Sequence, residues 1–160
     1  MKRMKGLVLS ILILAVALSC VCCSGKKAEG ADYSSYMGKE YTGQDPWGNP
    51  LSIKLVSMEE STVSFEYKDV IGEDEYMSTF VTESSGEMKE SVVPFHITAV
   101  SQESESIHCE YSGTLEMKDG SLFVTYEDGA VNEESPEGGS ASYQAPALEG
   151  ADKTVELTAK

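Results

Sequence analysis

Two histidines and a glutamate are the residues of this chain whose types and spacing could bind a metal ion. His96 stands in one alternating segment, and His108 and Glu110 stand in the next. If these segments pair with residue 97 opposite 109, His96 faces Glu110 and lies diagonal to His108. Diagonal neighbours are roughly 7–8 Å apart, close enough for two imidazoles to share zinc. We predict the simpler alternative, two exposed histidines and no metal, and keep these three residues as the candidates.

Motifs for catalysis are absent after the first twenty residues. The sequence has no Gly-x-Ser-x-Gly elbow, no His-Glu-x-x-His, no phosphate-binding loop and no paired Cys-x-x-Cys. The acidic runs at 73–75 and 127–128 lack the spacing of a calcium loop and are typical of solvated turns. We therefore predict a protein that is not an enzyme and has no cofactor.

The N-terminus has the three parts of a secretory signal. Lys2, Arg3 and Lys5 precede an apolar run over 6–18, which is too short for a permanent transmembrane helix. Small residues and a cysteine follow, in the order Ala-Leu-Ser-Cys over 17–20. The sequence thus predicts export from the cytoplasm.

Residues 17–20 resemble the lipobox of bacterial lipoproteins. The resemblance implies cleavage after Ser19 and a diacylglyceryl group on Cys20, which holds the protein on the extracytoplasmic face of the cell membrane. The chain departs from the usual pattern, with Ala17 in place of leucine and a bulky Leu18. Two alternatives stay open: cleavage after the A-x-A sequence 15–17, which would release a soluble protein, and an uncleaved anchor.

Composition divides the chain into three parts. We predict a signal peptide over 1–19, a lipidated flexible tether over 20–33 and one β domain over 34–160. Within that domain, 127–152 is rich in Gly, Glu, Ser and Pro and predicts a long acidic loop, and a brief pairing of 140–145 is left open. A lid, an arm for a partner and simple slack are all open for this loop.

Charge and cysteine usage restrict the partners. The chain has 27 acidic and 12 basic residues, a net charge of −15, and loses three of the basic ones with the signal. The mature form, at −18, should be repelled by nucleic acid.

The cysteines form a separate question. With Cys20 lipidated, Cys22 and Cys23 have no assigned role. Cys109 lies in an apolar alternation and is predicted to be a small core side chain, with a disulfide to the N-terminus as the alternative.

From Leu51 onwards, apolar and polar residues alternate with a period of two, which predicts half-buried antiparallel strands. The clearest alternation covers 107–118, where Gly113 predicts a bulge. Asp119-Gly120 then predicts a tight hairpin. The predicted inward side chains are Leu51, Ile53, Leu55, Val63, Phe65, Tyr67, Tyr76, Phe80, Phe95, Ile97, Ile107, Cys109, Tyr111, Leu115, Met117, Leu122, Val124, Tyr126, Val155 and Leu157.

About eight strands in meander order predict an all-β fold, an antiparallel up-and-down barrel that resembles lipocalins in plan. The lipocalin Gly-x-Trp signature is absent, and a two-sheet sandwich is the alternative. Trp47, the single tryptophan, lies in the turn-forming run 44–50 and is predicted to plug one end of the core. A ligand-stacking role for Trp47 is the other hypothesis.

Taken together, anchor and barrel predict a membrane-anchored lipoprotein that binds a small ligand or an envelope protein. The alternative is a structural component of the envelope whose barrel is packed with side chains and holds no ligand.

Overall fold

The structure of this chain is a computed structural model that describes residues 32–72, 77–134, 140–144 and 154–160. Within it, Asp32–Lys160 forms one compact unit. The predicted signal over 1–19, the lipidation residue Cys20, and Cys22 and Cys23 lie outside the described residues. No helix in the described part of the chain is long and apolar enough to cross a membrane.

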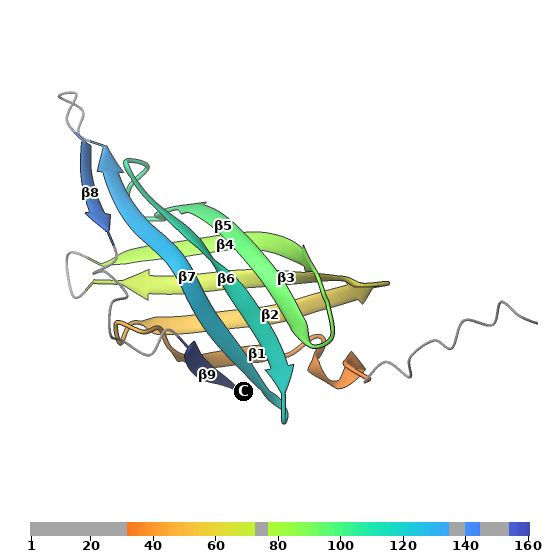
Figure 1. The fold of residues 1–160 in the computed structure, drawn as a ribbon. Coiled ribbons are helices and arrows are strands. Elements are labelled where there is room, and N and C mark those ends of the chain that lie inside the picture. Colours follow the sequence, from red (N-terminus) through yellow and green to blue (C-terminus); the bar gives the residue numbers. More distant parts are fainter. Residues whose placement is uncertain (1–31, 73–76, 135–139, 145–153) are drawn as a thin grey trace, which may run out of the picture. The chain divides into compact units, whose positions relative to one another are not determined.

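Nine strands and one turn of 3-10 helix form the described part of this unit (Figure 1). Alternating apolar and polar side chains form these strands because one face of each is buried. The elements are η1 (Ser34–Tyr36), β1 (Glu40–Gln44), β2 (Pro50–Glu59), β3 (Thr62–Ile71), β4 (Ser78–Glu87), β5 (Val92–Val100), β6 (Ile107–Lys118), β7 (Ser121–Glu134), β8 (Ser140–Gln144) and β9 (Thr154–Ala159).

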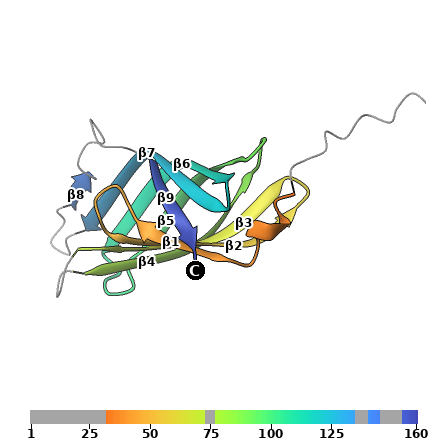
Figure 2. The ribbon, with the colours of Figure 1, turned by 90° about the horizontal axis from the view of Figure 1, so that it is seen from below.

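Eight of the strands form a nearly closed antiparallel barrel. Their order is β4-β3-β2-β1-β9-β7-β6-β5, so that β9 joins the first meander to the second (Figure 2). β4 and β5 meet at the seam, where Phe80 and Ser101 form a single bridging pair. This confirms the all-β up-and-down barrel, and the sandwich alternative is wrong because one continuous sheet curls around the core.

Two local features follow the sequence prediction. Asp119 and Gly120 both have positive φ, at 53° and 85°, as a tight hairpin turn requires. The register of β6 against β7 shifts between Ser112 and Gly113, so that Glu127 becomes the extra residue of a bulge. A Cβ on Gly113 would lie 2.1 Å from the carbonyl oxygen of Thr125, which explains the need for glycine at this bend.

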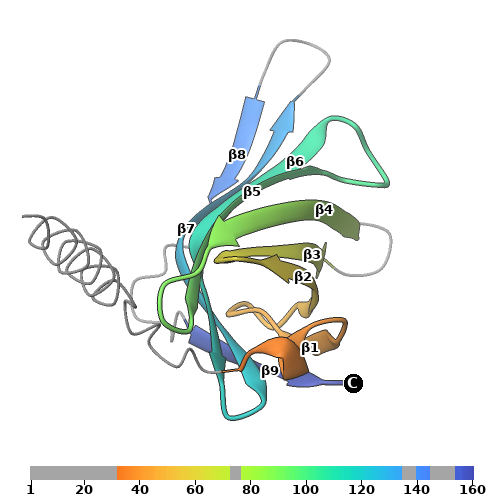
Figure 3. The same ribbon diagram turned by 90° about the vertical axis from the view of Figure 1, so that its right-hand side faces the viewer.

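The predicted loop over 127–152 is wrong for 127–134, which belongs to a strand, whereas the brief pairing left open for 140–145 is found. Strand β7 continues through Glu134, and β8 pairs with its last five residues, away from β9 (Figure 3). Asp128 and Gly129 lie within this strand, beside the bulge, and form no turn. Gly129 faces Tyr111, and a Cβ there would lie 2.3 Å from that ring.

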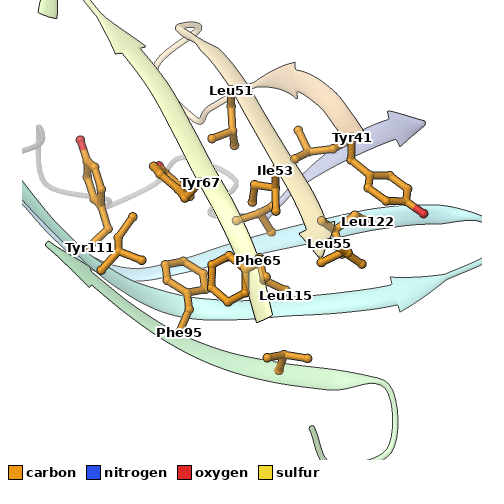
Figure 4. Close-up of a cluster of buried hydrophobic side chains, with 14 of the residues drawn as sticks. Tyr41, Leu51, Ile53, Leu55, Phe65, Tyr67, Phe95, Tyr111, Leu115 and Leu122 are labelled. Atoms are coloured by element: carbon orange, nitrogen blue, oxygen red, sulfur yellow. The ribbon is translucent and has the colours of Figure 1, made fainter. Parts of the chain in front are cut away.

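The core consists of the inward faces of the strands (Figure 4). Of the predicted inward residues, Ile107 and Val155 are only partly buried, and Tyr76 lies outside the described residues. The buried apolar side chains are Tyr41, Leu51, Ile53, Leu55, Val63, Phe65, Tyr67, Phe80, Val93, Phe95, Ile97, Ala99, Cys109, Tyr111, Leu115, Met117, Leu122, Val124, Tyr126 and Leu157.

The element η1 packs at the end of the barrel where the β6–β7 hairpin turns. The Tyr36 hydroxyl accepts a hydrogen bond from the Gly120 amide at 2.9 Å, and its ring stacks on Tyr41. The β1–β2 turn lies at the opposite end, since successive turns of an up-and-down barrel alternate between its two ends. One end of the barrel is therefore covered by η1, and the other end carries the β1–β2 turn with Trp47.

Candidate functional site

The β1–β2 turn is built around the carboxylate of Asp45. This group is 3% exposed and accepts hydrogen bonds from the amide of Trp47 at 2.9 Å and from the amide and side chain of Asn49 at 2.7 and 2.8 Å. An aspartate that bonds backbone amides a few residues ahead is a common way to fix a turn. Gly48, at φ 89°, supplies the positive φ. The turn therefore holds Trp47 in a defined place.

Trp47 lies against two tyrosines of the opposite wall. Its ring centroid is 6.0 Å from that of Tyr111 and 5.6 Å from that of Tyr126, and these two rings meet edge to face at 5.7 Å. Both tyrosines are fully buried, whereas Trp47 remains partly exposed. Trp47 thus packs against this end of the core, as predicted, and the residue stays partly exposed.

A series of buried hydrogen bonds connects the tyrosine hydroxyls to Asp69. The hydroxyls of Tyr67 and Tyr126 are 2.9 Å apart, and Tyr67 also donates to Oδ2 of Asp69 at 3.3 Å. Asp69 is 0% exposed, and its Oδ1 makes no hydrogen bond to the described residues. An unpaired buried carboxyl oxygen is costly, so it marks a candidate functional site.

Burial dominates the electrostatics of Asp69. Burial first, and then the nearby Asp45, raise the pKa of this carboxyl group from 3.8 to about 7, against the hydrogen bonds from Tyr67 and the Val70 amide. No lysine or arginine is among the buried side chains of the described chain. The Asp69 carboxyl group therefore has no buried basic side chain in the described residues to neutralise its charge.

The buried thiol and the buried phenols in this part of the interior stay protonated. Burial raises the pKa of Cys109 to about 12, and it raises the pKa values of Tyr67 and Tyr126 well above the ordinary value for a phenol. Cys109 is a free, buried cysteine, as its place in the alternation predicted. Its thiol is protonated at neutral pH and is a poor nucleophile.

The register of β5 and β6 differs by two residues from the one that we assumed for His96, His108 and Glu110. Ile97 pairs with Tyr111, so His96 lies opposite Ser112, and His108 lies opposite Val100. The assumed register is wrong because the turn after β5 is closed by a bond from the Ser101 amide to the Ile107 carbonyl, a pairing that the period of two does not fix.

His96 and Glu110 still meet on the outer face, with Nε2 and Oε1 3.3 Å apart. They line a shallow groove of about 220 Å³ together with Ser112 and Asp128. His108 is four residues along β6 from the partner of His96, and nowhere in the described residues do three metal-binding side chains converge.

Sequence reasoning did not single out Asp69, although a signal was present. The residue continues the inward positions of Val63, Phe65 and Tyr67, and a charged residue in an apolar alternation is unusual. The apolar alternation alone does not show which side chains would contact Asp69.

Comparisons with family models, curated proteins and solved structures find no match for this chain. Function is therefore inferred from the barrel and from the residues at its Trp47 end.

Proposed function

We propose that this chain is a lipid-anchored extracytoplasmic protein whose barrel binds a small ligand at the Trp47 end. The leader and the cysteine at position 20 support the anchor, and barrels of this size can hold one small ligand. The observation that carries the binding function is Asp69, a fully buried carboxyl group with one oxygen unpaired, beneath a partly exposed tryptophan.

Binding is a better fit to this site than catalysis. The buried thiol and phenols stay protonated, and no histidine lies among the buried residues of the described chain to take a proton from them. Such a site is suited to holding a molecule through one charged or polar group and several aromatic faces.

A packed structural barrel is the second candidate, and a specific observation favours it. The rings of Trp47, Tyr111 and Tyr126 touch one another, with centroids 5.6–6.0 Å apart, so a ligand would have to move the tryptophan. In that case the protein would serve the envelope as a spacer or an accessory to another protein.

A panel of small molecules separates the two candidates. The mature lipoprotein in detergent is titrated with cationic, neutral and anionic compounds, while the emission of its single tryptophan is recorded. We expect at least one class of compound to shift the emission of Trp47 saturably and to raise the melting temperature. No saturable shift with any class would favour the packed barrel instead.

A further inference from the structure

We propose that the ligand is a small organic cation, an ammonium compound whose charge lies beside Asp69 and whose substituents contact the surrounding aromatic rings. This inference rests on the binding function proposed above and names its chemistry.

The charge of the interior points to a cation. Asp45 and Asp69 are the two buried acidic residues of the described chain, and no basic side chain is buried with them. The three hydrogen bonds from Trp47 and Asn49 occupy the Asp45 carboxylate, while Oδ1 of Asp69 has no partner. A negative charge buried without a partner is stabilised by a proton or by a bound cation.

The aromatic side chains point to an organic cation rather than a metal ion. Tyr67, Tyr111, Tyr126 and Trp47 form one connected group, with ring centroids 5.6–6.3 Å apart. Rings of this kind attract ammonium groups through their negative faces, as in the aromatic cages that bind methylated amines. One free oxygen of a single carboxylate among phenols is by contrast a poor ligand set for a divalent ion.

Trp47 is the side chain through which a ligand reaches Asp69. It is the one ring of the four that meets solvent, and it lies on a turn rather than in a strand. A ligand at this end therefore changes the surroundings of Trp47, so that tryptophan emission reports on binding directly.

The cation and a proton compete for the Asp69 carboxylate, so binding should also depend on pH. A permanently charged ligand binds only the ionised carboxylate, and burial raises the pKa of Asp69 to about 7 in the free protein. The other groups that face Asp69 are Asp45, Tyr67, Tyr126, Tyr111 and Cys109, of which the tyrosines and the thiol stay protonated. Affinity should rise about tenfold between about pH 6 and pH 8.

The test compares charged and uncharged probes of equal shape. Choline and butylamine are titrated into the mature lipoprotein beside the uncharged carbon isostere of choline and butanol, with Trp47 emission as the readout. We expect the cations to bind at least tenfold more tightly than their isosteres. The Asp69→Asn variant should lose that preference, and Glu83→Gln, which removes an exposed acid from the outer face of β4, should keep it.

Each outcome is decisive. If the isosteres bind as tightly as the cations, or if Asp69→Asn keeps the preference, the cation inference is wrong while the binding function stands. If neither these probes nor the wider panel shift the emission of Trp47, both the cation inference and the binding function are wrong. Should Asp69→Asn fail to fold, the pH dependence of choline binding to the natural protein decides, since an affinity that does not change with pH would overturn the inference.

Discussion

Asp69 places a carboxyl group where a hydrophobic side chain would give a more stable barrel. Its neighbours across the sheet are Leu51 on β2 and Phe80 on β4, both fully buried. Because burial disfavours the ionised form, the folded protein holds the Asp69 proton more tightly than the unfolded chain does. A residue that costs stability in the core is more easily explained by binding than by packing.

This cost should appear as a dependence of stability on pH. The pKa of Asp69 is raised in the folded state from 3.8 to about 7, so its contribution is fully present below about pH 4 and is lost as the pH rises towards 7. The difference corresponds to a loss of about 4 kcal/mol in the free energy of unfolding.

Asp69→Asn should remove this dependence. We expect the variant to be about 2–4 kcal/mol more stable than the natural protein at pH 8 and nearly equal to it at pH 4. Urea denaturation followed by circular dichroism at both values measures the difference. Equal stabilities at pH 8 would mean that the Asp69 carboxylate is already neutralised in the folded protein.

At the scale of elements, the seam between β4 and β5 is closed by few contacts. The Thr79 carbonyl accepts from the Gln102 amide at 2.9 Å, and the Ser84 hydroxyl donates to the His96 carbonyl at 3.3 Å. The carboxylate of Glu103, in the turn after β5, accepts from the Thr79 amide at 2.6 Å. This carboxylate pairs a backbone amide at the edge of β4 that would otherwise face solvent.

Glu103→Gln should loosen the seam. The hydrogen bond from the Thr79 amide lowers the pKa of Glu103 to about 2, so the stabilisation is present above the ordinary value of 4.5 and is lost as the pH falls towards 2. We expect faster hydrogen exchange at the Thr79 amide in the variant at neutral pH, measured by NMR. Glu105→Gln, an exposed change in the same turn, is the control, and equal exchange in both variants would contradict this role of Glu103.

At the scale of the whole molecule, we propose that the lipid anchor on Cys20 and the acidic charge of the mature chain act together. A diacyl group supplies two chains, which is what stable membrane attachment generally needs. The acidic mature chain should be repelled by anionic lipid headgroups, which would hold the barrel away from the membrane surface.

Cys20→Ser should therefore move the protein from the membrane fraction to the soluble one. Cys22→Ser, two residues away, should leave it membrane-bound, and mass spectrometry of the natural protein should find Cys20 as the modified N-terminal residue. A free Leu18 amine at the mature N-terminus would show instead that the protein is secreted without lipid.

The sequence by itself determined the strands, the Asp119-Gly120 hairpin, the bulge at Gly113 and most of the inward residues. These features depend on neighbours a few positions away, because the period of two and the φ requirements of turns are local.

Only the tertiary structure decided the register of β5 on β6, the course of β7 beyond Glu127 and the surroundings of Asp69. Each depends on residues far apart in the chain: Tyr126 reaches the hydroxyl of Tyr67 across the barrel, and Asp45 of the β1–β2 turn comes close to Asp69 of β3. The alternation placed Asp69 on an inward face, but the pKa of its carboxyl group depends on which side chains the closed barrel brings around it.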